Sequence, residues 1–126
     1  MTTSAPLTDP DMTAALGDDG IVRLTWAPGI VITGEVAERS VVLVKSVSAG
    51  RERPLMVDMN DVKTITREGR NVYEDVGTMT ALALVGSSPV VRVLANFALS
   101  INHPGVPTRF CTSAAEAETF LRDYLR

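Results

Sequence analysis

The sequence predicts an α/β fold: a mixed, mainly parallel sheet with about four helices, in the order ββαβαβαβα. Short apolar or alternating runs typical of strands take turns with amphipathic segments at helical spacing. Helix-capping signals separate several of these segments. The 126 residues, 45% hydrophobic and 21% charged, suit one compact domain. Such alternation implies right-handed crossovers between neighbouring parallel strands.

The first half of the chain predicts two strands and a helix. Residues 21–26 alternate between apolar and polar side chains and are rich in β-formers, and residues 30–32 follow as a short second strand. Thr33 is a preferred helix N-cap, and acidic residues occupy the turns that follow it. The helix should run to about Ala49, because Gly50 is the residue type favoured just past a helix end.

The second half predicts one pattern, strand then helix, three times. The expected strands cover residues 55–59, 80–85 and 106–111. Each strand precedes a residue that caps helix N-termini, and these caps are Thr66, Ser88 and Ser113. Pro89 at a first helical position strengthens the second cap, and Glu116 completes a capping box with the third. The helix that begins at Ser88 should continue to about Asn102.

The N-terminal segment differs in charge from the rest of the chain. Residues 1–20 hold four aspartates and no basic residue, whereas residues 21–126 hold 12 basic and 11 acidic residues. The segment also has few large apolar side chains, so we expect an acidic, loosely held N-terminal arm over residues 1–20. Residues 12–16 could add a turn or an edge strand. A single domain should follow over residues 21–126.

Charge and hydropathy exclude several function classes. A net charge of −3 without a basic cluster gives no signal for nucleic acid. The apolar run 81–101 contains Pro89 and Arg92, which are costly in lipid, so we expect no membrane partner. The start of the chain lacks the basic and apolar regions of a signal peptide, so we expect a cytoplasmic protein.

Signals for catalysis and metal binding are missing as well. The sequence holds no phosphate-binding loop, dinucleotide fingerprint or nucleophile elbow. The single histidine, His103, and the single cysteine, Cys111, cannot alone form a zinc site or an internal disulfide. We expect His103 to end the third helix and Cys111 to be a buried, inert thiol, with a thiolate activated by the next helix start as the alternative. We therefore expect no cofactor and no metal, and we rank an enzyme below a binding protein.

One stretch of the chain carries a family resemblance. Residues 55–69 read Leu-Met-Val-Asp-Met-Asn-Asp-Val-Lys-Thr-Ile-Thr-Arg-Glu-Gly. This resembles the STAS domain, the SpoIIAA-like fold of bacterial anti-sigma-factor antagonists, in which a strand ends in Asp and Asp-Ser-Ser/Thr-Gly later opens a helix. Asp58 falls on the strand-end acid and Gly69 on the helix glycine. The whole sequence also resembles small actinobacterial proteins of this fold, and its excess of arginine over lysine is typical of a high-GC genome.

The sequence departs from that family at the regulatory position. The serine that the family's partner kinase phosphorylates would fall at Arg67, and the preceding acid would fall at Thr66. Because arginine cannot accept a phosphoryl group, the resemblance implies partner binding without the phosphorylation switch. A cation at the first turn of a helix also opposes the helix dipole.

Our first functional hypothesis is a non-enzymatic, regulatory interaction module that binds a protein partner. Its surface would be the loop and helix start between Asp58 and Arg70, with Asn60 in the loop and Arg67 one helical turn before Arg70. The alternatives are purely structural roles: Asp58 caps a turn, and the arginines form a solvated, salt-bridged face.

The second hypothesis is a small anionic or lipid-like ligand at the carboxyl ends of the strands. Ligands of α/β sheets usually bind there. Backbone N–H groups at Ser88 or Ser113 would contact the anion, with Arg67 or Arg109 as the cation.

The third helix predicts a homodimer. Its residues are apolar on nearly every side, which indicates burial against more than the sheet. The expected interface includes Val91, Ala95 and Leu99. The alternative is coverage of this helix within one chain.

Overall fold

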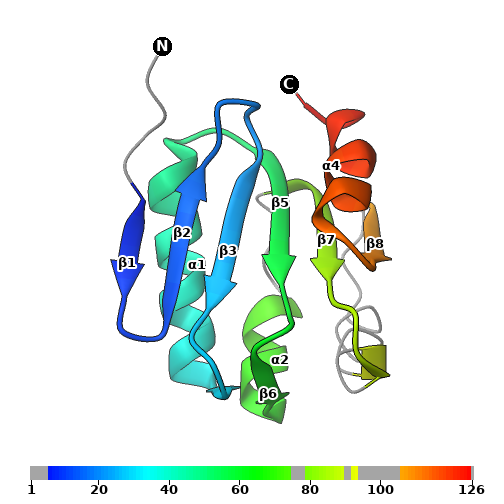
Figure 1. Cartoon of the computed structure of the whole chain (residues 1–126). Helices are drawn as coiled ribbons and strands as arrows, with labels where there is room; N and C mark the ends of the chain where they lie inside the picture. Colours follow the sequence, from blue (N-terminus) through cyan, green and yellow to red (C-terminus); the bar gives the residue numbers. More distant parts are fainter. Residues whose placement is uncertain (1–5, 75–78, 90–91, 94–105, 126) are drawn as a thin grey trace.

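The computed structural model describes residues 6–74, 79–89, 92–93 and 106–125 (Figure 1). Six strands form the main sheet: β1 (Leu7–Asp9), β2 (Met12–Leu16), β3 (Val22–Trp26), β5 (Arg53–Asp58), β7 (Met79–Val85) and β8 (Thr108–Cys111). They lie in the order β1-β2-β3-β5-β7-β8. The first two pairs are antiparallel, and β3, β5, β7 and β8 run parallel to one another. The predicted mixed, mainly parallel sheet is confirmed.

Helices cover both faces of this sheet (Figure 1). The helices α1 (Gly34–Ser48) and α2 (Arg67–Glu74) lie on one face, and α4 (Ala114–Arg122) lies on the other. About four helices were expected, and these are the three that the described ranges contain. The remaining expected helix falls mostly outside those ranges, although the backbone N–H of Arg92 donates to the carbonyl of Ser88 at 3.0 Å, as a helix beginning there requires. No helix among the described residues is long and apolar enough to cross a membrane.

Each face of the sheet has its own apolar cluster. The larger cluster packs under α1 and α2 and includes Leu24, Trp26, Ile32, Leu55 and Val57. The smaller one packs under α4 and is built largely from small side chains: Ile21, Met56, Ala81, Ala83, Val85, Cys111, Ala117 and Leu121. The two are separated because successive strand residues point to opposite faces.

Local capping signals explain the helix bounds. The Thr33 side chain accepts a hydrogen bond from the Val36 N–H at 3.2 Å, and α1 ends where Ala49 and Gly50 take positive φ of 55° and 77°. The Ser113 side chain likewise accepts from the Glu116 N–H at 3.2 Å at the start of α4. The helices predicted from these caps are confirmed, because a cap satisfies backbone donors that the first turn leaves unpaired.

The N-terminal segment corrects our expectation of a loosely held arm. Residues 7–16 form β1 and β2, and Met12 and Ala14 are buried beneath α1. Arg39 of α1 forms ion pairs with Asp9 and, at 2.6 Å, with Asp11. A backbone hydrogen bond from Asp11 and the Arg39 guanidinium hold the pKa of Asp9 below its usual value. Two of the four aspartates that suggested a solvated arm, Asp9 and Asp11, instead attach this hairpin to α1.

A second, two-stranded sheet was not expected. The strands β4 (Ile30–Ile32) and β6 (Val62–Ile65) pair in parallel, apart from the main sheet. The sequence predicts a strand over residues 30–32 and none over residues 62–65, where the polar Lys63 and Thr64 interrupt the apolar pattern. In the structure those two side chains are exposed, and β6 leads directly into α2.

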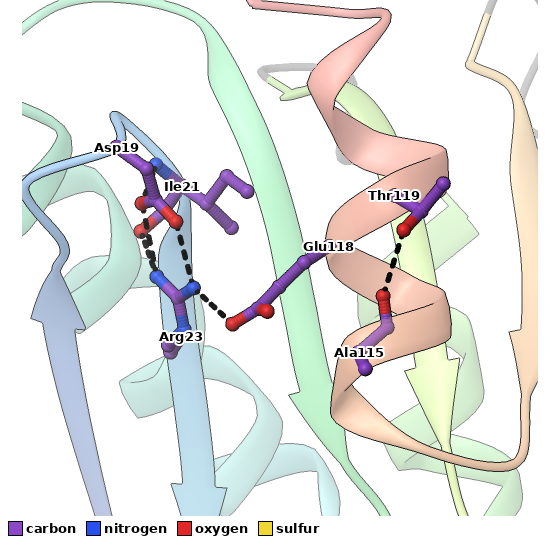
Figure 2. A network of polar contacts seen from close by, with 6 residues as sticks. All are labelled: Asp19, Ile21, Arg23, Ala115, Glu118 and Thr119. Carbon is purple, nitrogen blue, oxygen red and sulfur yellow. Dashed lines mark hydrogen bonds and ion pairs between the residues drawn. The ribbon is translucent and has the colours of Figure 1, made fainter.

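A charged network attaches α4 to the sheet (Figure 2). The Arg23 guanidinium of β3 donates to Asp19 at 2.8 and 3.1 Å and to Glu118 of α4 at 2.8 Å. Its hydrogen bonds to Asp19 lower the pKa of that carboxyl and raise the pKa of the guanidinium. At the other end of α4, the Thr80 hydroxyl donates to the Tyr124 carbonyl at 2.8 Å.

Candidate partner-binding surface

The start of α2 is fixed by hydrogen bonds to the end of β4. Both the backbone N–H and the hydroxyl of Thr66 donate to the Ile32 carbonyl, at 3.0 and 3.3 Å. The Thr66 oxygen in turn accepts from the Gly69 N–H at 3.0 Å, which caps α2. The Thr66 hydroxyl is therefore used as donor and as acceptor.

A glycine lets the two helix starts approach each other. A Cβ atom at Gly69 would lie 2.3 Å from the Ile32 carbonyl oxygen, which is far inside van der Waals contact. A Cβ at Gly34, the first residue of α1, would lie 3.2 Å from the Cβ of Glu68. The starts of α1 and α2 thus lie side by side at one end of the molecule. The close approach gives a physical reason for the glycine at position 69.

Further along the same helix pair, a buried hydrogen bond joins α1 to α2. The hydroxyls of Ser40 and Tyr73 lie 2.6 Å apart, and Ser40 also donates to the Ala37 carbonyl at 2.6 Å. Ser40 is 1% exposed, and burial raises the pKa of Tyr73 to about 12. Since a buried hydroxyl is costly without a partner, this bond helps to fix the position of α2.

Arg67 is the first residue of α2, as the sequence predicted, and its side chain is exposed. Among the described residues it has no ion-pair partner, whereas Arg70, three residues later, is half-buried and is engaged with a neighbouring group. The two arginines that we expected to act together therefore differ: Arg67 is exposed, and Arg70 is half-buried and already has a partner.

Two loops at the carboxyl ends of the parallel strands are tied together. Asp58 accepts hydrogen bonds from the backbone and side chain of Asn60, at 2.9 and 3.0 Å. The Asn60 side-chain oxygen accepts from the backbone N–H of Ser87 at 3.1 Å, and the Ser87 hydroxyl lies 3.4 Å from it. The structure thus brings Asp58 and Asn60 together, as expected, and adds Ser87 next to the predicted Ser88. Because both loops follow strands that pair in the sheet, this contact could have been anticipated.

The described parallel strands contain no point at which the strand order reverses. Ligands of open α/β sheets bind where the strand order reverses and the crossover helices diverge to opposite faces. Here β3, β5, β7 and β8 follow one another without reversal, and α1 and α2 lie on the same face. The backbone N–H of Gly29 also donates to the Asp61 carbonyl at 2.8 Å, which ties a third loop to this edge.

Arg109 lies apart from the other predicted site residues. It projects from β8 on the face covered by α4, where its guanidinium lies 5.9 Å from the centre of the Phe120 ring and 3.8 Å from Glu116. Arg67 belongs to α2 on the opposite face. The small-ligand hypothesis allowed either arginine as its cation, and the two belong to separate surfaces.

Several expectations concern other positions. Val91, Ala95, Leu99 and His103 lie outside the described residues. Cys111 is buried, and burial is the main cause that raises the pKa of its thiol, in agreement with an inert cysteine. Within the described ranges, no group of three histidine, cysteine, aspartate or glutamate side chains is arranged to hold a metal ion.

Comparisons with known proteins concern the family of this chain and its fold. Residues 15–125 match the model of a family described as Domain of unknown function (DUF7793). No protein of curated function matches the sequence. A solved structure of an uncharacterized protein from the DUF3478 family, with a SpoIIAA-like fold, from Shewanella loihica PV-4 is 17% identical, with a TM-score of 0.61 over 96% of this chain and 98% of that one.

Two further solved structures are similar. An anti-sigma factor antagonist from Mycobacterium paratuberculosis is 22% identical, with a TM-score of 0.59 over 93% of this chain and all of that one. A protein of unknown function from Arthrobacter sp. FB24 is 41% identical over 86% of this chain and 90% of that one, with a TM-score of 0.35. The Shewanella and Mycobacterium structures confirm the predicted SpoIIAA-like fold.

Proposed function

This chain belongs to the DUF7793 family and has a SpoIIAA-like fold, and from this premise we propose that it is a regulatory module that binds a protein partner through the start of α2. The supporting observation is that Arg67 is exposed on a helix start fixed by backbone contacts from Thr66 and Gly69 to Ile32. A surface with little freedom loses little conformational entropy on binding.

The fold comparison supports a regulatory role. One structural neighbour is described as an anti-sigma factor antagonist, a name that assigns that protein a role in regulation. The family resemblance puts Arg67 where the modifiable serine would fall, and the neighbouring Thr66 hydroxyl already acts as both a donor and an acceptor. We therefore propose binding that does not depend on phosphorylation of this helix start.

The test compares two arginine variants in quantitative affinity capture from a lysate of the source organism. Arg67→Ala should reduce recovery of the specific partner about tenfold, as loss of one well-placed charged contact does. Arg122→Ala removes an exposed arginine at the far end of the opposite face and serves as the matched control. Equal unfolding temperatures would show that both variants fold. Equal recovery of the same proteins by the wild type and both variants would show that the Arg67 surface does not bind the partner.

A homodimer remains a second proposal, based on the apolar segment 90–101. Val93 is the described apolar residue of this segment, and 58% of it is exposed, which leaves it available to a second subunit. Light scattering at micromolar concentration should give twice the monomer mass. A monomeric mass would exclude the interface.

A further inference from the structure

Among the described residues, the outer edge of β8 has backbone groups that no other strand pairs. The Pro107 carbonyl accepts from the Leu82 N–H at 2.9 Å, and the Cys111 carbonyl accepts from the Gly86 N–H at 3.0 Å, so both face β7. Because alternate residues of a strand direct their backbone groups to the same side, Thr108 and Phe110 direct theirs away from β7. In the part of the chain that the structure describes, β7 is the single strand that pairs with β8.

An exposed arginine flanks this edge on each face of the sheet. Phe110 points to the face of α1 and α2, and the Arg92 guanidinium lies 4.9 Å from the centre of its ring. Arg109 points to the opposite face and lies over the ring of Phe120 on α4. Each cation thus rests on an aromatic ring that orients it.

Neither arginine is fully neutralised by the described residues. Arg92 is exposed and has no ion-pair partner among them. The Arg109 side chain is 58% exposed, and its contact with Glu116 is long, at 3.8 Å. The Glu116 carboxylate is used mainly by the backbone and hydroxyl of Thr112, at 2.9 and 3.1 Å. An acidic chain of net charge −3 therefore has a local basic edge.

The opposite edge of the sheet is protected in a way that β8 is not. Pro6 and Pro10 flank β1, and proline on an edge strand hinders pairing with another chain. The charge of Asp9 at the end of β1 is paired with Arg39. Pro107 comes next to β8 as well, but its backbone faces β7 and leaves the outer edge open.

We propose that the outer edge of β8 binds an extended, acidic segment of a partner protein as an added strand. Thr108 and Phe110 exchange backbone hydrogen bonds with the segment, as in strand addition to other sheet edges. Adjacent side chains of an added strand point to opposite faces, so two consecutive carboxylates reach Arg92 and Arg109. A second copy of this chain is disfavoured, because pairing β8 with itself would bring like charges together. This surface is separate from the start of α2.

The first test measures amide hydrogen exchange of the isotope-labelled full chain by NMR. The amides of Thr108 and Phe110 should exchange rapidly, and that of Arg109, which faces β7, should exchange at least about tenfold more slowly. Arg109 is thus an internal control within one strand. Slow exchange at Thr108 and Phe110 in the free monomer would show that the edge is covered, and would overturn the proposal. The same protection in a dimer would assign the edge to a second copy and equally overturn it.

The second test identifies the chemistry of the segment. A displayed library of random heptapeptides is panned on the wild-type chain, and enriched peptides are titrated against wild type, Arg92→Gln, Arg109→Gln and the double variant. We expect proline-free peptides with consecutive acidic residues, about tenfold weaker binding for each single variant and a larger loss for the double variant. Arg122→Gln should bind as wild type does. No enrichment of such peptides, or binding unchanged in the double variant, would overturn the proposal.

Discussion

The two faces of the main sheet are covered by different means. On one face, the start of α2 is fixed to the end of β4, since the backbone N–H and the hydroxyl of Thr66 both donate to the Ile32 carbonyl and Gly69 leaves no space for a side chain. On the other face, α4 is attached through side chains, namely its small apolar cluster and the bridge between Arg23 and Glu118. Close contact with the β4 backbone fixes the proposed partner surface, whereas α4, held by side chains, should detach from the sheet more easily.

The difference indicates which helix has the more rigidly fixed position. The start of α2 cannot shift without breaking both hydrogen bonds from Thr66 to the Ile32 carbonyl, so it keeps a defined shape. A helix held by alanine, leucine and ion pairs loses its attachment in smaller steps, because each contact contributes separately. The variants below test this contrast, in order of decreasing expected effect.

The largest effects should come from truncating one buried leucine on each face of the sheet, namely Leu24 of β3 and Leu121 of α4. Leu24→Ala and Leu121→Ala remove side chains that are 3% and 0% exposed, and each should lower the free energy of unfolding by about 3 kcal/mol. Urea titration measures this loss. Cys111, buried under α4, reports local opening through its rate of reaction with a thiol reagent.

The thiol reaction distinguishes the two faces. At matched stability in native buffer, Leu121→Ala should raise the Cys111 reaction rate much more than Leu24→Ala, because α4 opens without the rest of the fold. Equal acceleration by both variants would mean that α4 opens only on global unfolding, and the contrast between the faces would be lost.

The next effect concerns the backbone contact. Gly69→Ala places a Cβ against the Ile32 carbonyl and should cost about 2–3 kcal/mol, although alanine normally favours a helix. Gly29→Ala is a useful control, because Gly29 also has a special backbone conformation, with φ of 75°, but no atom lies within 4 Å of the added Cβ. That variant should cost only about 1–2 kcal/mol of backbone strain. Similar losses, measured by urea titration, would show that steric contact at Gly69 is not decisive.

A smaller effect is expected from Tyr73→Phe, which removes the hydroxyl contact with Ser40 and should cost about 1 kcal/mol at pH 7. Burial raises the pKa of Tyr73 from 10.0 to about 12 in the folded state. Its contribution is therefore complete below about pH 10 and is lost as the pH rises towards 12, since the unfolded chain releases the proton more readily. The stability difference between wild type and Tyr73→Phe should shrink over that range in urea titrations. A constant difference would contradict the buried position of the hydroxyl.

Sequence patterns predicted those parts of the fold that depend on local chemistry. The caps Thr33 and Ser113 placed α1 and α4 closely, because a cap and its helix are separated by only three residues. Strand–helix alternation predicted the parallel strands correctly. The cap Thr66 predicted the helix start at Arg67, and the structure gives the physical reason for Gly69.

Contacts distant in sequence account for what the patterns missed. The hairpin of β1 and β2 depends on Arg39, about 30 residues later, and on burial beneath α1. The short strand β6 is stabilised by pairing with β4 rather than by its own composition. Nor could the sequence place Arg67 and Arg109 on opposite faces, because that depends on which side of the sheet each helix packs against.

The smallest expected effect separates the two charged attachments. Arg23→Gln weakens the link between β3 and α4, and because these groups are partly solvated it should cost about 0.5–1 kcal/mol or less, decreasing with added salt. Arg39→Gln removes the corresponding link between the N-terminal hairpin and α1. Arg23→Gln should accelerate the reaction of Cys111, and Arg39→Gln should not.

The pKa values of Asp9 and Asp19 are both lowered, so both attachments stabilise the fold above about pH 4 and lose their effect as the pH falls through the folded pKa values. The acceleration by Arg23→Gln should therefore vanish in acid, where the wild-type attachment is already weakened, and its persistence there would assign the effect to packing of the arginine stem instead.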